Sequence, residues 1–312
     1  MSETGDSMTK LYLITGFLGA GKSTFIRAFT QAFPEKRIAL IINEFGKTGV
    51  DGALLRETAL EMTEIDNGSI FCSCRAEQFQ DAVLEILKRN QAELIFVEAS
   101  GLADPTAVRG IFKQSIYDNL EYAGAICIVD AVRFHKIYQT AKVSRMQLAI
   151  SDLVLINKTD LATRQQIDEI TAVVKAQKPG RPVHETVFGA FDRQWLQEME
   201  EPLEQPDSVE PHTKDLTLRK LTMVVTGFDL SSLTSFLKMF ADDTYRVKGF
   251  VQLPEGCYLV DCVGPIVEVK PYEGETNGIN CLTVLFGNGL PAKRSIREAI
   301  SWFEKANVKL EG

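Results

Sequence analysis

The chain has 312 residues, 45% of them hydrophobic, which is enough to bury a large core and predicts two domains. Its 34 basic and 42 acidic side chains give a net charge of −8, which argues against a general nucleic-acid binder, because such proteins carry a basic field. The N-terminal segment lacks the layout of a signal peptide and no apolar run approaches the ~20 residues of a membrane span, so we expect a cytoplasmic protein with no membrane partner.

The segment Leu11 to Phe25 contains the motif on which the functional prediction depends. Residues 16–23 read GFLGAGKS, a full match to the phosphate-binding loop pattern G-x-x-x-x-G-K-[ST], between the apolar run Leu11 to Ile14 and a predicted helix. Gly16, Gly19 and Gly21 are expected to let successive backbone N–H groups turn inward toward phosphate oxygens. The positive end of the following helix is aimed at the same place.

The last residues of this loop supply the expected chemistry. Lys22 can reach the β- and γ-phosphates, and the Ser23 hydroxyl can ligate Mg²⁺. Ala20 and Thr24 belong to the same predicted nucleotide-binding set. A glycine-rich turn that matches the pattern by chance is the alternative interpretation.

A second buried strand is predicted over Arg37 to Ile42; it ends in Asn43 to Gly46, and a polar stretch, Lys47 to Gly52, follows. Polar residues at the carboxyl end of a parallel strand point into the ligand crevice, where a loop can sense the γ-phosphate and Mg²⁺. Glu44 is the candidate for orienting the attacking water. An ordinary strand-to-loop exit is the alternative that this stretch leaves open.

Cys72 and Cys74 form a C-x-C pair between a short predicted strand and turn, Met62 to Ile70, and a predicted amphipathic helix, Glu77 to Arg89. Two thiolates at this spacing can share a soft metal such as Zn²⁺ or Cu(I), and in a cytoplasmic protein we expect thiols or metal ligands rather than disulfides. Two ligands do not complete a tetrahedral site, and no histidine is near in sequence. From the residue types alone, two unliganded cysteines are the favoured interpretation.

A third apolar strand, Leu94 to Glu98, ends in an acid. Downstream of a phosphate-binding loop, such an acid is expected to anchor Mg²⁺, usually through a water. Gly101 would offer its backbone N–H to the γ-phosphate, which makes Ala99 to Pro105 a predicted switch loop. A strand end with a solvated carboxylate is the alternative.

The strand predicted over Leu153 to Ile156 runs directly into the sequence NKTDL. The Asp160 carboxylate can accept from guanine N1–H and the N2 amino group together, and adenine offers no such donor pair. The Lys158 stem can lie over the base, and Asn157 can brace the loops. This N-K-x-D sequence, placed after the phosphate-binding loop and the acid-ended strand, predicts guanine recognition.

Two other strands complete the predicted sheet. The strand Gly124 to Val129 ends at Asp130 and contains Cys127, which is expected to be a small core residue. The strand Val183 to Val187 is the sixth, and its exit, Phe188 to Ala190, is the last loop expected to touch the base.

An acidic segment with three prolines, Gln197 to Pro211, has the composition of a solvated linker. Beyond it we expect a small α+β domain, with a helix on one face of a mainly antiparallel sheet. Cys257, Cys262 and Cys281 fall in its strands and are expected to pack in the core, with a shared metal site as the alternative. The expected elements are strands over Lys220 to Phe228, Val247 to Leu253, Cys257 to Val263, Pro265 to Val269 and Asn280 to Phe286, a helix capped by Asp229 or Ser231 and running to Phe240, and a closing helix over Ala292 to Ala306.

With these residues in place, the chain resembles the CobW-type GTPases, relatives of the urease and hydrogenase nickel-insertion GTPases. The second domain is similar more loosely, through Tyr245 to Gly249 and the strand ending in Phe286 and Gly287. The resemblance implies a GTP-hydrolysing domain and a CobW-type C-terminal domain, in a family whose members are thought to deliver metals or help load metal cofactors into client proteins. The segments that match are Gly16 to Thr24 (GFLGAGKST), Asn43 to Gly46 (NEFG), Glu98 to Pro105 (EASGLADP), Val129 to Ala131 (VDA) and Asn157 to Leu161 (NKTDL).

One departure from the family pattern concerns metal. The family motif is C-x-C-C after an Asn-Gly pair, whereas here Asn67 and Gly68 are followed by SIFC, so that only Cys72 matches and Cys74 is added. Two positions that are acidic in some relatives, just before and just after the NEFG segment, are Ile42 and Lys47 here. The resemblance therefore carries the GTP chemistry over position by position, but not the metal site.

The sequence thus predicts an α/β P-loop GTPase domain over residues 1–196, with a mostly parallel sheet and helices on both faces, a linker over 197–212, and a smaller α+β domain over 213–312. The predicted function is a Mg²⁺-dependent GTPase that acts as a switch in loading a metal or a metal cofactor, for example a corrinoid, into a client protein. Intrinsic hydrolysis is expected to be slow, with a partner or a second copy in a homodimer completing the site. The alternative is a metallochaperone that carries Zn²⁺ or another transition metal on Cys72 and Cys74.

Overall fold

The structure is a computed structural model, and it describes residues 8–42, 61–64, 76–90, 92–99, 101, 119–199, 218–274, 276, 278–303 and 306–311, with 61–64, 76–78 and 90 described by their backbone alone. The predicted site residues Glu44, Cys72 and Cys74 lie outside this part of the chain. The same holds for most of the predicted switch loop after Ala99 and for most of the predicted linker.

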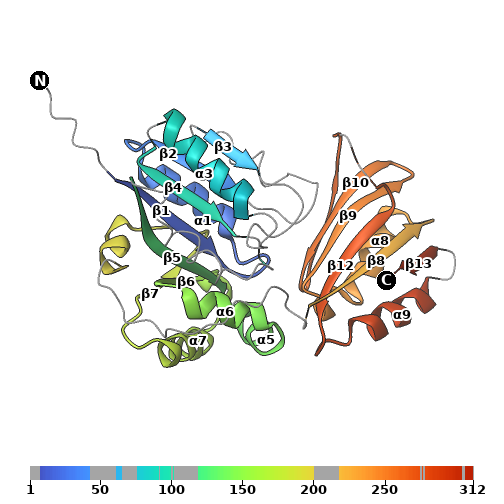
Figure 1. Cartoon of the computed structure of the whole chain (residues 1–312). Helices are drawn as coiled ribbons and strands as arrows, with labels where there is room; N and C mark the ends of the chain where they lie inside the picture. The colour runs from blue at the N-terminus through green and yellow to red at the C-terminus, as the bar shows by residue number, and fades with distance from the viewer. Residues whose placement is uncertain are drawn as a thin grey trace, which may run out of the picture. The chain divides into compact units, whose positions relative to one another are not determined.

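The first half of the chain forms one parallel sheet, in which β1 is central and is flanked by β4 and β5 (Figure 1). Its strand order is β3-β2-β4-β1-β5-β6-β7. All the strands pair in parallel, so their carboxyl ends lie along one edge of the sheet. The strands are β1 (Thr9–Thr15), β2 (Ile38–Ile42), β3 (Glu61–Glu64), β4 (Leu94–Glu98), β5 (Leu120–Asp130), β6 (Leu153–Asn157) and β7 (Val183–Thr186).

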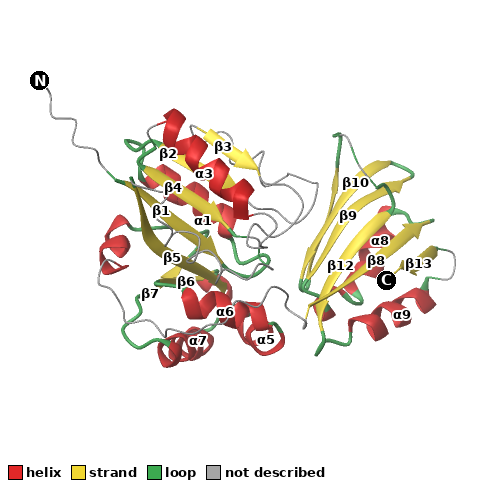
Figure 2. Ribbon diagram, viewed as in Figure 1, coloured by secondary structure: helices red, strands yellow, loops and turns green. Residues whose placement is uncertain are grey.

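Successive residues of each inner strand pack in hydrophobic clusters on opposite faces of the sheet, because successive side chains of a strand point in opposite directions. In β1, Leu11 and Leu13 pack in one cluster with Phe79 of α3, whereas Tyr12 and Ile14 pack with α1 on the other face. Helices therefore cover both faces of the sheet (Figure 2), which confirms the predicted fold class. The helices are α1 (Lys22–Ala32), α3 (Ala76–Asn90), α5 (Phe134–Thr140), α6 (Lys142–Ile150) and α7 (Arg164–Gln177), with 3₁₀ turns η1 (Thr159–Leu161) and η2 (Arg193–Met199).

The second part of the chain forms a separate antiparallel sheet of order β11-β10-β9-β12-β8-β13. Two helices, α8 and α9, pack on one face of it, through residues such as Phe236 and Ile296. The helix α8 begins at the predicted N-cap Asp229, which forms a capping box with Ser232, so the predicted cap at Asp229 is confirmed and Ser231 is not the capping residue. The elements are β8 (Leu218–Thr226), α8 (Leu230–Lys238), η3 (Ala241–Asp243), β9 (Arg246–Leu253), β10 (Gly256–Val263), β11 (Ile266–Pro271), β12 (Cys281–Gly287), α9 (Ala292–Trp302) and β13 (Asn307–Glu311).

The predicted closing helix over Ala292 to Ala306 is wrong at its carboxyl end. The helix α9 stops at Trp302, and β13 follows and pairs with β8. Val308 and Leu310 of β13 pack against the core of this domain, and the residues beside them, Asn307, Lys309 and Glu311, are polar. This two-residue alternation is a strand pattern, and it is too short to stand out from the helix before it.

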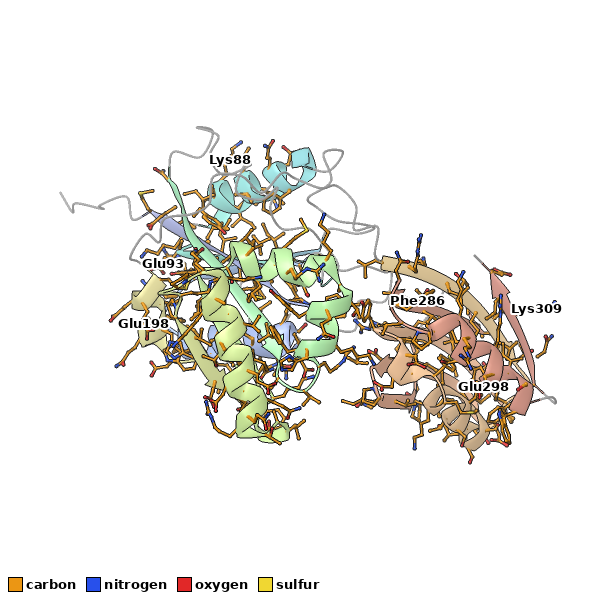
Figure 3. All side chains as sticks on the ribbon, turned by 90° about the horizontal axis from the view of Figure 1, so that it is seen from below. Lys88, Glu93, Glu198, Phe286, Glu298 and Lys309 are labelled. Atoms are coloured by element: carbon orange, nitrogen blue, oxygen red, sulfur yellow. The ribbon has the colours of Figure 1, made fainter. Side chains whose placement is uncertain are left out.

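The chain divides into two compact units, one of Met1–Tyr138 and Lys142–Lys214 and one of Asp215–Gly312 together with Gln139–Ala141. Charged side chains lie on the exposed faces of α3 and α9, where Figure 3 labels Lys88 and Glu298. Among the helices that the structure describes, none is long and apolar enough to span a membrane.

Candidate nucleotide-binding site

The loop between β1 and α1 takes a backbone shape that only glycine adopts without strain. Gly16, Gly19 and Gly21 have φ angles of 138°, 73° and 104°. A Cβ atom on Gly16 would lie 2.3 Å from the carbonyl oxygen of Ile128, and one on Gly21 would lie 2.3 Å from the side-chain nitrogen of Asn157. The loop is therefore packed directly onto the carboxyl ends of β5 and β6.

The amino-terminal turn of α1 faces this loop. The bond from Phe25 N to Gly21 O, at 2.9 Å, is the first of the helix, so the N–H groups of Lys22, Ser23 and Thr24 precede the intrahelical ladder. Such a turn binds anions through these N–H groups and the helix dipole. The Ser23 side chain is half-buried, and that of Thr24 is exposed.

Lys22 folds back over the loop that precedes it. Its ammonium donates to the carbonyl oxygens of Gly16 at 3.1 Å and Phe17 at 3.5 Å, and the residue is only 8% exposed. This places a buried positive charge within the phosphate-binding loop. A phosphate group that entered the loop would meet this ammonium and the helix N–H groups together.

Asn157, the last residue of β6, joins three loops through one side chain. Its amide nitrogen donates to Ala20 O at 2.9 Å, and its side-chain oxygen accepts from the N–H of Gly189 at 3.1 Å. Gly189 in turn lies so close to α1 that a Cβ there would be 2.7 Å from the Cα of Phe25. The loop after β7, which the sequence predicted to be near the base, is thus tied to the exit of β6 and to the start of α1.

Lys158 continues from Asn157 in the left-handed region, at φ 64°. Its ammonium donates to Gly19 O at 2.8 Å and to the carboxylate of Asp130 at 2.6 Å. Asp160 follows in the 3₁₀ turn η1 and is exposed to solvent. The N-K-x-D segment and the phosphate-binding loop are therefore bonded directly to each other, and Asp160 lies outside the core.

Glu98 closes β4 and lies in register with Ile14 and Ile42, beside the entrance to the phosphate-binding loop. The residue is 8% exposed. Gly101 lies against the loop as well, because a Cβ on it would be 2.7 Å from the N atom of Leu18, and its carbonyl oxygen accepts from the Gln147 side chain at 3.1 Å. Carboxylate and hydroxyl oxygens are the ligands that Mg²⁺ prefers, so Glu98 and Ser23 are a donor set that suits this ion.

The structure brings the described predicted residues to the same carboxyl edge of the sheet. The sequence did not single out Asp130 or Gln147 as site residues. An acid at the end of a buried strand was a usable signal for Asp130, whereas nothing in the sequence of α6 marks Gln147. The predicted residues at this edge are Gly16, Gly19, Ala20, Gly21, Lys22, Ser23, Thr24, Glu98, Gly101, Asn157, Lys158 and Asp160.

No cluster of three or more metal-ligating side chains occurs within the described ranges. Cys127 and Cys262 are buried in strands, and burial raises the pKa of each thiol to about 12. The expected core position holds for Cys262 but not for Cys257 and Cys281, which are half-buried and alternate with core residues along β10 and β12.

A glycine loop between the central strand and a helix, in a parallel sheet with helices on both faces, defines the class of P-loop nucleotide-binding proteins. The chain belongs to the CobW/HypB/UreG family: the profile described as "CobW/HypB/UreG, nucleotide-binding domain" matches residues 10–185. The resemblance inferred from the motifs is thereby confirmed.

Two curated relatives show the extent of the likeness. The chain is 33% identical over 188 residues to "Zinc chaperone YjiA" of Escherichia coli (strain K12), which covers 58% of each chain. It is 32% identical over 200 residues to "Zinc chaperone CobW" of Sinorhizobium sp, which covers 54% of this chain and 56% of the relative. The chain therefore matches little more than half the length of these relatives.

Among solved structures, the crystal structure of the Zn(II)-bound YjiA GTPase from E. coli is similar over 95% of this chain and 99% of that chain. The sequence identity in that superposition is 20%, and the TM-score is 0.48.

Proposed function

We propose that this protein is a Mg²⁺-dependent GTPase that hydrolyses GTP to GDP and phosphate and acts as a switch in loading a metal or a metal cofactor into a client protein. The observation that carries the GTPase proposal is the pair of direct bonds from Asn157 and Lys158 to the carbonyls of Ala20 and Gly19. These bonds hold a base-recognition segment at a fixed place beside a phosphate-binding loop, as a purine nucleotide requires.

Each residue has a role that follows from its position. Lys22 and the first N–H groups of α1 stabilise negative charge on the β- and γ-phosphates, because phosphoryl transfer depends mostly on positioning and electrostatics. Ser23 and Glu98 would hold Mg²⁺, which when bound supplies positive charge at the phosphate oxygens. Asp160 accepts from guanine, and Gly101 offers its N–H to the γ-phosphate. Glu44 stays the predicted residue for orienting water.

The test is steady-state phosphate release from GTP by wild type and by Lys22→Ala. We expect turnover to fall by at least about a hundredfold in the variant, since a preorganised charge at the transferring phosphate is lost. Lys36→Ala is the matched control, because Lys36 pairs with Glu93 and neither lies at the site (Figure 3 labels Glu93). Chelation should stop turnover and Mg²⁺ alone should restore it. Unchanged turnover in Lys22→Ala refutes the assignment.

A second candidate function is a metallochaperone that itself carries Zn²⁺ or another soft metal on Cys72 and Cys74. The names of the two curated relatives, both zinc chaperones, favour this candidate. Equilibrium dialysis with Zn²⁺ compares wild type with the double variant Cys72→Ser/Cys74→Ser. Stoichiometric Zn²⁺ that this variant loses supports a carrier, and Cys257→Ser/Cys281→Ser is the control at the half-buried cysteines. Wild type without bound Zn²⁺ supports a switch that carries no metal on these residues.

The partners remain proposals. A client metalloprotein or cofactor-dependent protein would receive the metal or cofactor, and a partner or a second copy of this chain would complete the catalytic site. The cytoplasmic location stays a prediction from composition. Capture of bound proteins in the presence of a non-hydrolysable GTP analogue, compared with GDP, tests for a client that recognises only one nucleotide state.

A further inference from the structure

Asp130 lies between the two loops of the proposed nucleotide site. It is the last residue of β5 and stands in register with Asn157 at the end of β6. Its neighbour Ala131 donates its N–H to Asn157 O at 2.9 Å, so the exits of β5 and β6 are bonded to each other. Asp130 is only 4% exposed, although a carboxylate is rarely buried unless it is paired.

The two oxygens of the Asp130 carboxylate have different partners. Oδ1 accepts from the N–H groups of Val132 at 2.9 Å and Arg133 at 3.2 Å, and so it holds the turn after β5. Oδ2 accepts from the ammonium of Lys158 at 2.6 Å. One side chain thus connects the turn that follows β5 with the lysine of the base-recognition segment.

Lys158 is held at both ends. Its backbone is in the left-handed region, and its ammonium lies between Asp130 and Gly19 O. A lysine side chain is otherwise flexible, and its ammonium is a compact point charge whose position depends on its partners. Without the carboxylate, this ammonium would keep its bond to the carbonyl of Gly19, but a neutral carbonyl binds an ammonium more weakly than a carboxylate does.

We propose that Asp130 is a positioning residue for nucleotide binding: it fixes the Lys158 side chain in the conformation that forms one wall of the base site and keeps that wall joined to the phosphate-binding loop. This inference rests on the proposed function. Because the contact is at the base end, its effect is shared by GTP and GDP and belongs to affinity rather than to the chemical step.

The test is the Asp130→Asn variant. Asparagine keeps an oxygen for the N–H groups of Val132 and Arg133, but its amide cannot pair with the Lys158 ammonium. We expect the affinity for GTP and the affinity for GDP to fall by the same factor, about tenfold, as for loss of a charge-assisted hydrogen bond. In steady-state assays, the loss should appear in KM rather than in kcat.

A double-mutant cycle separates this role from a general structural one. In a Lys158→Met background, Asp130→Asn should cause little further loss of affinity, because the group that it positions is gone. A full tenfold loss in that background would overturn the inference.

Asp152 provides a matched control at the opposite edge of the same sheet. Its Oδ2 accepts from the N–H of Ala125 at 2.9 Å and its Oδ1 binds the ammonium of Lys178 at 3.1 Å, so its bonding repeats that of Asp130. It directly precedes β6, at the amino end of this strand, whereas both loops of the site lie at the carboxyl edge of the sheet. We expect Asp152→Asn to leave nucleotide affinity at the wild-type value.

The possible outcomes decide separate questions. Wild type that binds no guanine nucleotide would refute the proposed function itself. Wild type that binds, with Asp130→Asn binding equally well, or with Asp152→Asn weakened as much as Asp130→Asn, would overturn the inference alone. If circular dichroism shows that Asp130→Asn does not fold, Asp130→Ser, whose hydroxyl still accepts from the turn, takes its place with the same expected result.

Discussion

Asn157 and Lys158 show how much of this site is set by single side chains. Each donates to a carbonyl of the phosphate-binding loop, from a strand that is more than a hundred residues away in sequence. The loop itself can approach β5 and β6 only because Gly16 and Gly21 have no side chain. Gly16, Gly21 and the side chains of Asn157 and Lys158 therefore set the spacing between the phosphate-binding loop and the exit of β6.

Phe188 combines a strained backbone conformation with a side chain that is exposed to solvent and does not pack in a core. Its φ is 52° and it is 79% exposed. A bulky residue in the left-handed region costs roughly 1–2 kcal/mol that glycine does not. We therefore predict that Phe188→Gly raises the free energy of unfolding by about 1 kcal/mol, as measured by urea denaturation.

Leu161→Gly is the matched control for that prediction. Leu161 is also a large exposed hydrophobic residue, at 63%, but its φ is not positive. There a glycine should lower stability by roughly 0.5–1 kcal/mol. Equal destabilisation by both substitutions would show that the backbone at Phe188 is not strained.

At the scale of single residues, the sequence was informative where a motif has a fixed spacing. Lys22 and Asp160 could be named because each stands at a set place in a short pattern. Asp130 could not be assigned a partner, because its bond to Lys158 spans 28 positions and depends on how two strands align. A contact between residues that are distant in sequence forms only when the chain folds, so no local sequence pattern reveals it.

At the scale of elements, the buried parallel strands were the easiest to predict. Runs such as Leu94 to Val97 are apolar throughout, since both faces of their sheet are covered. The strand β13 was missed because it has only Val308 and Leu310 as apolar residues and gains its stability from pairing with β8, more than eighty residues earlier. The sequence also did not show which face of the second sheet Cys257 and Cys281 occupy, so both were predicted to lie in the core, whereas both are half-buried.

The burial of the four cysteines that lie in described strands predicts the order in which their thiols react. In the native protein at pH 8, we expect iodoacetamide to leave Cys127 and Cys262 unmodified, because burial raises the pKa of both thiols to about 12 and so disfavours the reactive thiolate. The half-buried Cys257 and Cys281 should be modified faster, and all four should react after unfolding in urea. Site-by-site mass spectrometry measures this order, and rapid native labelling of Cys127 would contradict its burial.

At the scale of the whole molecule, the two compact units have separate cores. The first unit is built around the parallel sheet, and the second has its own cluster of side chains, including Phe236 and Val284, on one face of the antiparallel sheet. The overall class of each unit was predictable from the order of strands and helices. The linker predicted over residues 197–212 stays a prediction, because most of it lies outside the described residues, and the two units divide at Lys214 and Asp215.

Two cores predict two unfolding transitions in calorimetry. GTP with Mg²⁺ at a hundred times its Kd should add about 2.7 kcal/mol to the unit that binds it. Only one transition should therefore move to higher temperature, and ATP at the same concentration should move neither. A shift of both transitions by GTP, or a single transition, would contradict independent units with the nucleotide site in one of them.

The central claim is that a guanine nucleotide binds with its phosphates in the loop between β1 and α1 and its base at the exit of β6. The most direct measurement is a calorimetric titration of GTP and xanthosine triphosphate into wild type and Asp160→Asn, with Mg²⁺ present. The account predicts that wild type prefers GTP and that the variant, whose amide suits the 2-oxo group of xanthine, prefers xanthosine triphosphate. A variant that still prefers GTP as strongly as wild type does would contradict it.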